Sequence, residues 1–195
     1  MYTSYKKMTL EEIIVLAQQN DFNALEELIR REQKSVFASF SYLSNNGDNV
    51  SDLTQEALLR LAKNIHNLRN PKFFKSWLNQ IVTHLFYDDV RKKHRQVETV
   101  SFDDETDDDL PKIKFQLPDY KCKPNEKCLS SELEKIIKSA IRELPDKFRV
   151  AIVLREFQGL SYEEIALATN TTIGTVKSRI SRARGRLQED LKEYI

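Results

Sequence analysis

Residues 159–187, GLSYEEIALATNTTIGTVKSRISRARGRL, decide how the rest of the chain is interpreted, because they predict two short helices joined by a tight turn. Ser161 is a suitable N-cap for the first helix, and Glu164 completes a capping box three residues later. The Thr-Asn-Thr sequence at 169–171 favours a turn, and Thr172 is expected to cap the second helix. A capped helix, a short turn and a second helix in this order predict a helix-turn-helix unit.

The second predicted helix is amphipathic and basic. Its apolar residues follow the spacing of a buried stripe: Val176, Ile180, Ala183 and Leu187. Five basic residues and no acidic residue lie between positions 173 and 187, so the exposed surface attracts phosphate whatever the base sequence. Its first turns can reach base edges, which favours DNA over the alternative of a solvated helix in a bundle. The candidate DNA contacts are Thr175, Lys177, Ser178, Ser181 and Arg182.

The composition favours an all-α protein of two small domains. The chain has 195 residues, 31% of them charged and only four of them glycine. Its net charge of +1 is segregated into basic tracts at 91–95 and 177–186 and an acidic tract at 103–109. We find neither an apolar run that could span a membrane nor the apolar core of a signal peptide, so we expect a cytoplasmic protein without membrane insertion.

The sequence shows no pattern typical of an enzyme or of a metal site. Its three histidines are scattered, and neither an HExxH nor a Walker motif is present. Cys122 and Cys128 are separated by five residues, which is neither a redox pair nor half of a usual zinc site, so we interpret them as reduced, exposed thiols. We therefore expect no catalysis, no cofactor and no metal.

Apolar periodicity and punctuation predict the domain organisation. Helices are expected from near Thr9, from near Asp21 up to a break at 44–48, and over 51–64, followed by a helix that continues through the basic run at 91–95. These elements form an N-terminal helical domain, 1–97. Residues 98–127 lose the periodicity and hold three of the five prolines, which predicts an acidic flexible linker. Helices at 129–144 and 146–157 then precede the helix-turn-helix, giving a four-helix C-terminal domain over 128–195.

Three segments resemble one known family. ELPDKFRVAIVLREFQGLSYEEIA at 143–166 and GTVKSRISRAR at 174–184 resemble the C-terminal DNA-binding part of bacterial sigma factors of the extracytoplasmic-function (ECF) group. DLTQEA at 52–57 resembles the segment by which these factors grip the clamp helices of the RNA polymerase β′ subunit. The resemblance covers about 50–94 and 130–190. It implies a transcription initiation factor that binds core RNA polymerase, also through the β flap, directs it to promoter DNA and helps to open the duplex.

The resemblance also implies which residues make these contacts. On the helix at 51–64, the apolar residues point inward, and Asp52, Gln55 and Glu56 are left for the polymerase. A base flipped out of the minus-10 element is implied to enter the loop around Asn70-Pro71 and to meet the following helix. The residues so assigned are Leu68, Arg69, Asn70, His84 and Asp88, with Arg91 and Lys92 as phosphate contacts. The basic C-terminal helix is implied to read the minus-35 element.

The crowded aromatic residues after this loop allow two interpretations. Phe73, Phe74 and Trp77 stand beside Lys72 and Lys75, a combination that suits stacking on single-stranded DNA. Helical spacing instead assigns Trp77 to the core, which is the interpretation we favour for that residue. At Leu68 and His84 the family more often has an aromatic residue and an asparagine, so the chain departs there from the usual pattern.

The acidic tract at 103–109 contributes six carboxylates in seven residues, which repel one another and keep the segment open. In the resembling family this connector runs into the polymerase cleft along the path later used by nascent RNA. We therefore expect the acidic tract to imitate nucleic acid there and to lower non-specific DNA binding of the protein alone. A solvated spacer is the alternative.

Two functions of other classes remain as alternatives. A stand-alone regulator would bind an operator through the same helix-turn-helix without polymerase, although we find no heptad seam for a dimer after Leu187. A protein-interaction module would use its helical N-terminal half only to bind protein. The resemblance favours the sigma factor and further implies regulation by an anti-sigma factor.

Overall fold

The computed structural model describes residues 5–44, 49–98, 127–192 and 194. Every element within these ranges is helical, which confirms the predicted all-α class for this part of the chain. The predicted linker lies outside the described residues except at its two ends, and so do its acidic tract and Cys122. The elements are η1 Tyr5–Lys7, α1 Leu10–Gln18, α2 Phe22–Leu43, α3 Val50–Asn64, η3 Ile65–Asn67, η4 Pro71–Phe73, α4 Phe74–Glu98, α5 Lys127–Glu143, α6 Asp146–Glu156, α7 Tyr162–Thr169 and α8 Ile173–Asp190.

The predicted helix starts are confirmed by their caps. Thr9 Oγ1 accepts a hydrogen bond from the backbone N–H of Glu12 at 3.3 Å, and the Glu12 carboxylate accepts one from the Thr9 N–H at 2.7 Å. Asp21 caps α2 by accepting from the backbone N–H groups of Asn23 and Ala24. Such caps satisfy N–H groups that the first turn of a helix leaves without a partner, which fixes where each helix begins.

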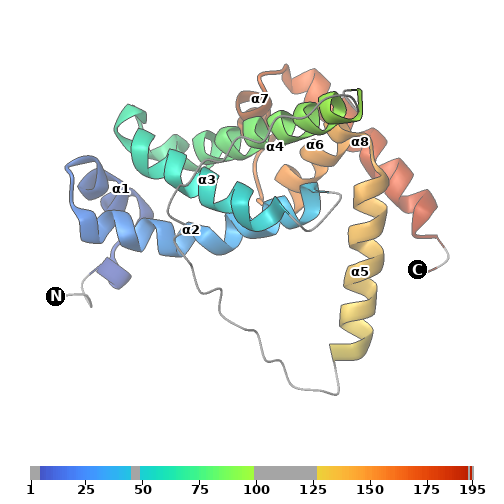
Figure 1. The fold of residues 1–195 in the computed structure, drawn as a ribbon, viewed down its shortest axis with the longest axis horizontal. Helices are drawn as coiled ribbons and strands as arrows, with labels where there is room; N and C mark the ends of the chain where they lie inside the picture. Colours follow the sequence, from blue (N-terminus) through green and yellow to red (C-terminus); the bar gives the residue numbers. More distant parts are fainter. Residues whose placement is uncertain (1–4, 45–48, 99–126, 193, 195) are drawn as a thin grey trace.

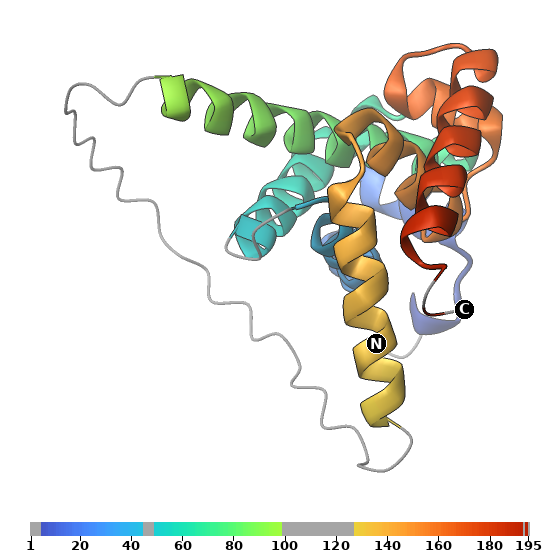
Figure 2. The same cartoon turned by 90° about the vertical axis from the view of Figure 1, so that its right-hand side faces the viewer.

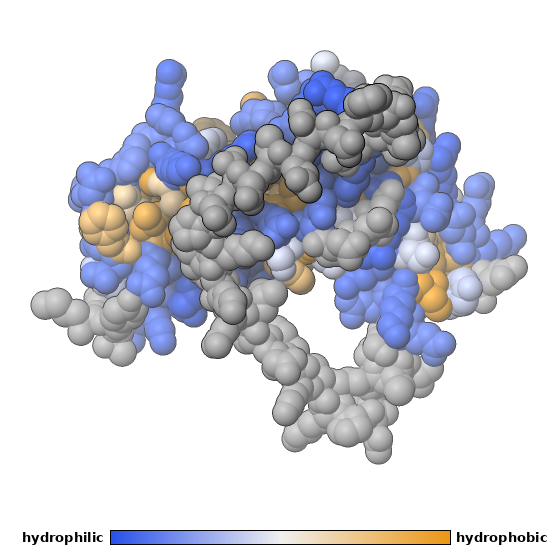
Figure 3. Space-filling view, viewed as in Figure 1, coloured by the Kyte–Doolittle hydropathy of each residue, from blue (hydrophilic) through white to orange (hydrophobic). Residues whose placement is uncertain are grey.

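The N-terminal half is built around α2, which packs against α1, α3 and α4 (Figure 1). Its core contains Phe40, Leu61, Phe74 and Phe86, each no more than 1% exposed. Polar residues cover most of the visible surface, with apolar residues gathered over α1 and the start of α2 (Figure 3). Phe22 and Val15 are exposed in that region, at 82% and 41%.

The C-terminal half is organised around α6, whose residues from Phe148 to Leu154 are all buried. Helices α7 and α8 pack against α6, and α5 leads into it through the turn at Leu144-Pro145. Figure 2 shows α5 standing apart from the other helices over its first half, in agreement with the exposure of residues 132–135. Within the described ranges, every helix falls short of the length or the apolarity that a membrane crossing requires.

The two halves touch each other. α4 packs against α7, and α2 packs against both α5 and α6. The helix-turn-helix therefore lies beside the helix that was predicted to contact the minus-10 element.

Candidate nucleic-acid interface

The helix-turn-helix forms with the predicted caps. Ser161 Oγ accepts from the Glu164 N–H at 3.1 Å, and the Glu164 carboxylate accepts from the Ser161 N–H at 2.7 Å. Asn170 ends α7 in the left-handed conformation, with φ of 50°, which asparagine tolerates better than most residues. Thr172 Oγ1 then accepts from the Thr175 N–H at 3.2 Å and starts α8. The turn is thus set by residues that lie within the quoted motif.

The predicted stripe of α8 faces the core of the C-terminal half. Val176, Ile180 and Ala183 are at most 2% exposed, and Leu187 packs partly buried against the core. Burial of this stripe fixes the rotation of α8 and turns Lys177, Ser178, Ser181 and Arg182 toward solvent, where all four are exposed. Thr175, whose backbone N–H donates to Thr172 in the cap, is half-buried.

The five basic residues of α8 have different surroundings. Arg184 forms an ion pair with Glu156 of α6 at 2.6 Å, and Arg186 lies over the Phe148 ring at 5.4 Å. Within the described part of the chain, neither Lys177 nor Arg182 takes part in an ion pair. Arg179, the fifth basic residue, is only half-exposed and lies near Tyr87 of α4. Lys177 and Arg182 are therefore the charges most available to a polyanion.

The hydroxyl groups on this face are partly engaged within α8. Ser178 Oγ donates to the Thr175 carbonyl at 2.9 Å, and Thr175 Oγ1 lies 2.9 Å from Thr172 Oγ1. A hydroxyl that donates internally keeps lone pairs that accept from base amino groups. In this conformation, the Ser178 hydroxyl is available only as a hydrogen-bond acceptor on this surface.

The three residues that the sequence predicts to contact polymerase share one side of α3. Asp52 is exposed, whereas Gln55 and Glu56 are half-exposed. Glu56 forms an ion pair with Arg60 at 2.7 Å, a partner that sequence reasoning missed although it stands four residues later on the same helix. Leu59, 47% exposed, follows Asp52 by seven residues and places an apolar side chain on this side.

The predicted minus-10 loop has one buried member and two exposed members. Leu68 is only 7% exposed, and its carbonyl accepts from Gln18 Nε2 at 2.7 Å, so this residue anchors the loop on α1. Arg69 and Asn70 are exposed. The side-chain oxygen of Asn70, Oδ1, accepts a hydrogen bond from the Lys72 N–H at 3.0 Å and so caps η4. This bond holds the loop in place.

A hollow of ≈ 570 Å³ adjoins this loop. Its walls come from the loop, the first turns of α4 and the end of α7, and its lining residues are Asn67, Leu68, Arg69, Asn70, Phe73, Ser76, Trp77, Gln80, Leu167 and Asn170. Phe73 is 53% exposed and Trp77 half-buried, so both aromatic residues are accessible from the hollow. Amide, guanidinium and aromatic groups together suit an unstacked base.

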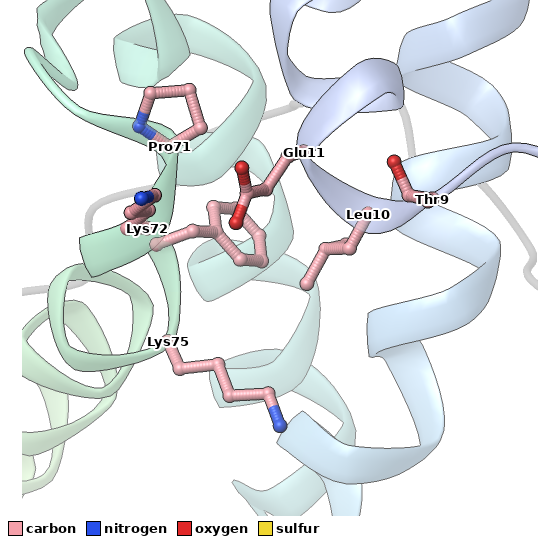
Figure 4. Close-up of a pocket in the computed structure, with 7 residues that line it drawn as sticks. Thr9, Leu10, Glu11, Pro71, Lys72 and Lys75 are labelled. Carbon is pink, nitrogen blue, oxygen red and sulfur yellow. The ribbon is translucent and has the colours of Figure 1, made fainter.

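A second hollow, of ≈ 470 Å³, lies on the other side of the same segment. Figure 4 shows Glu11 of α1 facing Pro71 and Lys72, while Lys75 extends toward α2. Burial raises the pKa of Glu32 on α2, and the nearby charge of Lys75 opposes that rise. With an acid on one wall and lysines on the other, this hollow lacks the uniform positive charge of a phosphate site.

The remaining predicted contacts on α4 are exposed. His84, Asp88, Arg91 and Lys92 all reach solvent, and Arg91 forms an ion pair with Asp88 on the same helix. This surface continues from the hollow toward the end of α4, which projects from the rest of the molecule (Figure 2).

Comparison with known proteins finds two family models that match parts of this chain. The family model described as sigma-70 region 2 matches residues 28–96, and that described as sigma-70 region 4 matches residues 134–187. The ECF RNA polymerase sigma-E factor of Haemophilus influenzae is 32% identical over 190 residues, which covers 96% of this chain and 97% of that protein. This chain belongs to the ECF sigma factor family.

Further relatives of this chain are also sigma factors. The sigma-E factor of Escherichia coli K12 is 31% identical, with 97% of this chain and 98% of that protein covered. The ECF sigma factor SigE of Mycolicibacterium smegmatis is 34% identical, although the chain spans only 62% of its length. Among solved structures, RpoE of Bartonella quintana in complex with the anti-sigma factor NepR has a TM-score of 0.66 and 28% identity over 86% of this chain and 96% of its own.

As an ECF sigma factor, the protein directs RNA polymerase to promoters and is not an enzyme. The region 2 match contains α3, the loop and most of α4, and the region 4 match contains most of α5 and all of α6 and α7. Similarity over nearly the whole chain decides against the stand-alone regulator and the protein-interaction module.

Proposed function

We propose that this sigma factor contacts its partners through three separate surfaces, within domains bounded at 1–97 and 128–195 and joined by residues 98–127. The clamp surface is the side of α3 with Asp52, Gln55 and Glu56. The minus-10 surface consists of the exposed Arg69, Asn70, His84, Asp88, Arg91 and Lys92 together with Leu68, which is buried and lines the hollow beside them. The minus-35 surface consists of Thr175, Lys177, Ser178, Ser181 and Arg182.

The minus-35 assignment is carried by the availability of Lys177 and Arg182, since Arg184 and Arg186 are engaged with α6. We expect replacement of both by Ala to cost about 1–3 kcal/mol per lost base contact and to reduce the salt dependence of DNA binding. The measurement is holoenzyme binding and runoff transcription on a promoter selected from a random duplex library with the parent protein.

Lys192→Ala combined with Lys135→Ala is the control matched for two lost charges, because both lysines are exposed and lie outside the proposed surface. Parental transcription by the double variant, with normal folding, would remove the assignment. A loss that the Lys135→Ala and Lys192→Ala control reproduces would instead point to non-specific attraction.

The clamp assignment is carried by the exposed acidic side of α3. We expect reversal of Asp52 and Glu56 to Lys to weaken the binding of core polymerase, since two attractive charges become repulsive. The double reversal of Glu189 and Asp190, both exposed at the end of α8, controls for net charge. Equal retention of core enzyme by all three proteins in a DNA-free pull-down would contradict the claim.

We further propose that an anti-sigma factor binds this protein. The support is the likeness to a sigma factor solved in complex with one. An anti-sigma factor would cover a surface that the sigma factor needs for binding polymerase or promoter DNA, so adding it should stop runoff transcription. If it covers the clamp surface, the reversals of Asp52 and Glu56 should also change its affinity for the sigma factor.

A further inference from the structure

Gln18, the last residue of α1, holds the segment that leads into the minus-10 loop. Its side-chain Nε2 donates to the Ile65 carbonyl at 3.0 Å and to the Leu68 carbonyl at 2.7 Å. Its own backbone carbonyl lies 2.9 Å from Nδ1 of His66. Because a carbonyl oxygen only accepts, the proton of this bond belongs to the ring nitrogen. These three contacts join residues that are 47 to 50 positions apart in the chain.

The segment held by Gln18 cannot satisfy its own backbone groups. Helix η3 is three residues long, and a 3-10 helix this short leaves carbonyl groups without partners at its end. Ile65 and Leu68 are only 0% and 7% exposed, so water competes little for the bonds to their carbonyls. The Gln18 amide therefore supplies donors at a place where the short helix has none to offer.

The bond to Leu68 acts directly on the first exposed residue of the minus-10 loop. A carbonyl and the N–H that follows it lie in one rigid plane, so fixing the Leu68 carbonyl also fixes the direction in which the chain enters Arg69. At the far end, Asn70 accepts from the N–H groups of Lys72 and Phe73, each at 3.0 Å. Arg69 and Asn70, the two exposed members of the loop, are thus held from both sides.

Helix α1 is itself firmly placed. Ile13, Ile14 and Ala17 are at most 2% exposed and bind it to the core of the N-terminal half. Asn20, in the left-handed conformation with φ of 65°, turns the chain from α1 into α2. α1 contacts both η3 and η4, and Glu11 faces η4 across the second hollow (Figure 4). A helix fixed in this way can transmit its position to the loop.

Gln18 belongs to none of the three proposed surfaces. Helix α1 ends before residue 28, where the region 2 match begins. The Gln18 side chain is half-buried, and its amide already donates to the two carbonyls, so it acts on the loop and not on DNA.

We propose that Gln18 is a positioning residue for minus-10 recognition, through which α1 holds the loop in the conformation that accepts an unstacked base. Loss of its donors lowers both the affinity for a single strand and the discrimination among bases, although Gln18 touches no DNA. This inference rests on the proposed minus-10 surface, and its test separates the two.

The size of the effect follows from the fraction of time that the loop keeps this conformation. If loss of the Gln18 contacts lowers that fraction to about a fifth or a tenth, single-strand affinity falls by about fivefold to tenfold, because only the competent fraction binds. The clamp surface on α3 and the minus-35 surface on α8 do not include the loop. Binding of core polymerase and of a minus-35 duplex should therefore stay unchanged.

The test uses holoenzyme reconstituted from core polymerase and the full-length protein. Gln18→Glu keeps the shape of the side chain but removes its donor hydrogens, and Gln18→Met removes them without adding a charge. Gln19→Glu, at an exposed position of the adjoining residue, is the matched control for charge. Ile13→Val, in the buried stripe of α1, is the control for lost stability.

The DNA is a promoter selected from a random duplex library with the parent protein. It is prepared as two forks, in each of which one strand is left single over the minus-10 element. Affinity is measured for the selected forks and for forks in which each minus-10 base is replaced in turn. Hydrogen exchange over residues 65–73 of the protein reports the order of the loop without DNA.

Both Gln18 variants should bind the selected fork about fivefold to tenfold more weakly than the parent. The ratio of affinities between selected and replaced forks should fall toward one, and the amides of Leu68, Lys72 and Phe73 should exchange faster. Gln19→Glu and Ile13→Val should keep the parental ratio. A purely structural role would lower both affinities in step with the folded fraction and leave the ratio as it is.

Unchanged exchange, an unchanged ratio, or an effect of Gln18→Glu that Gln18→Met does not share overturns the inference. Arg69→Ala tests the minus-10 surface itself. If Arg69→Ala weakens fork binding and the Gln18 variants do not, the inference fails and the surface stands. If neither change weakens fork binding, the minus-10 assignment fails and the inference fails with it. If only the Gln18 variants weaken it, the inference stands and Arg69 is removed from the surface.

Discussion

Glu27 on α2 provides a prediction whose size follows from the structure. The residue is 7% exposed, and its carboxylate accepts hydrogen bonds from Arg30 at 2.7 and 2.8 Å and from Arg31 at 2.8 Å. Arg31 also donates to the carbonyls of Met8 and Tyr5, at 3.0 and 2.8 Å. Glu27 therefore orients the guanidinium that fastens η1 to α2, and Glu27→Gln removes the charge while keeping the volume.

The hydrogen bond from Arg30 lowers the pKa of Glu27 from 4.5 to about 2, with Arg31 contributing and burial opposing. A difference of roughly 2.5 units corresponds to about 3.4 kcal/mol at about 1.36 kcal/mol per unit. The Arg30 side chain is 58% exposed, so solvent screens part of this attraction. We expect Glu27→Gln to lower the free energy of unfolding by about 1–3 kcal/mol at neutral pH. For a chain of this length, each kcal/mol lowers Tm by about 2–4 °C.

The pH dependence has a definite sign. Because the pKa of Glu27 is lower in the folded than in the unfolded chain, its stabilisation is complete above about pH 4.5 and is lost as pH falls toward about 2. Urea unfolding followed by circular dichroism should therefore show a parent-to-variant difference at neutral pH that shrinks at about pH 3.5. Glu132→Gln, at an exposed position of α5, is the control. Equal stability at neutral pH, or a difference that does not change with pH, would refute the reasoning.

Three further predictions concern the helix-turn-helix. Ser161→Ala removes the oxygen that accepts from the Glu164 N–H and should cost about 0.5–2 kcal/mol in urea unfolding. Gly159→Ala should cost about 1–2 kcal/mol in thermal unfolding, because φ is +66° and an added Cβ meets nothing within 4 Å, so conformation alone sets the cost. Ile180→Ala, at a position 2% exposed, should cost about 2–5 kcal/mol, and duplex binding should fall in step with the folded fraction measured by circular dichroism.

Local sequence determined where the helices begin and which side of α8 is buried. The capping boxes at Thr9 and Ser161 and the cap at Thr172 join residues three apart, and the stripe through Val176 and Ile180 repeats every turn. Interactions of this range depend only on the spacing of residues within one element. The amino-acid sequence was therefore sufficient to predict the helix-turn-helix and the exposed residues on α8.

Other features were decided only by how the helices pack. Arg184 and Lys177 look alike in the sequence, but Arg184 meets Glu156, 28 residues away, while Lys177 stays open to solvent. Leu68 was assigned to the minus-10 surface by resemblance, yet its side chain is buried in the core. The hydrogen bond from Ser35 of α2 to Gln158 after α6 joins residues that are 123 positions apart. Such contacts depend on the relative positions of whole helices, which are set by many weak packing contacts together, so no spacing within a single element encodes them.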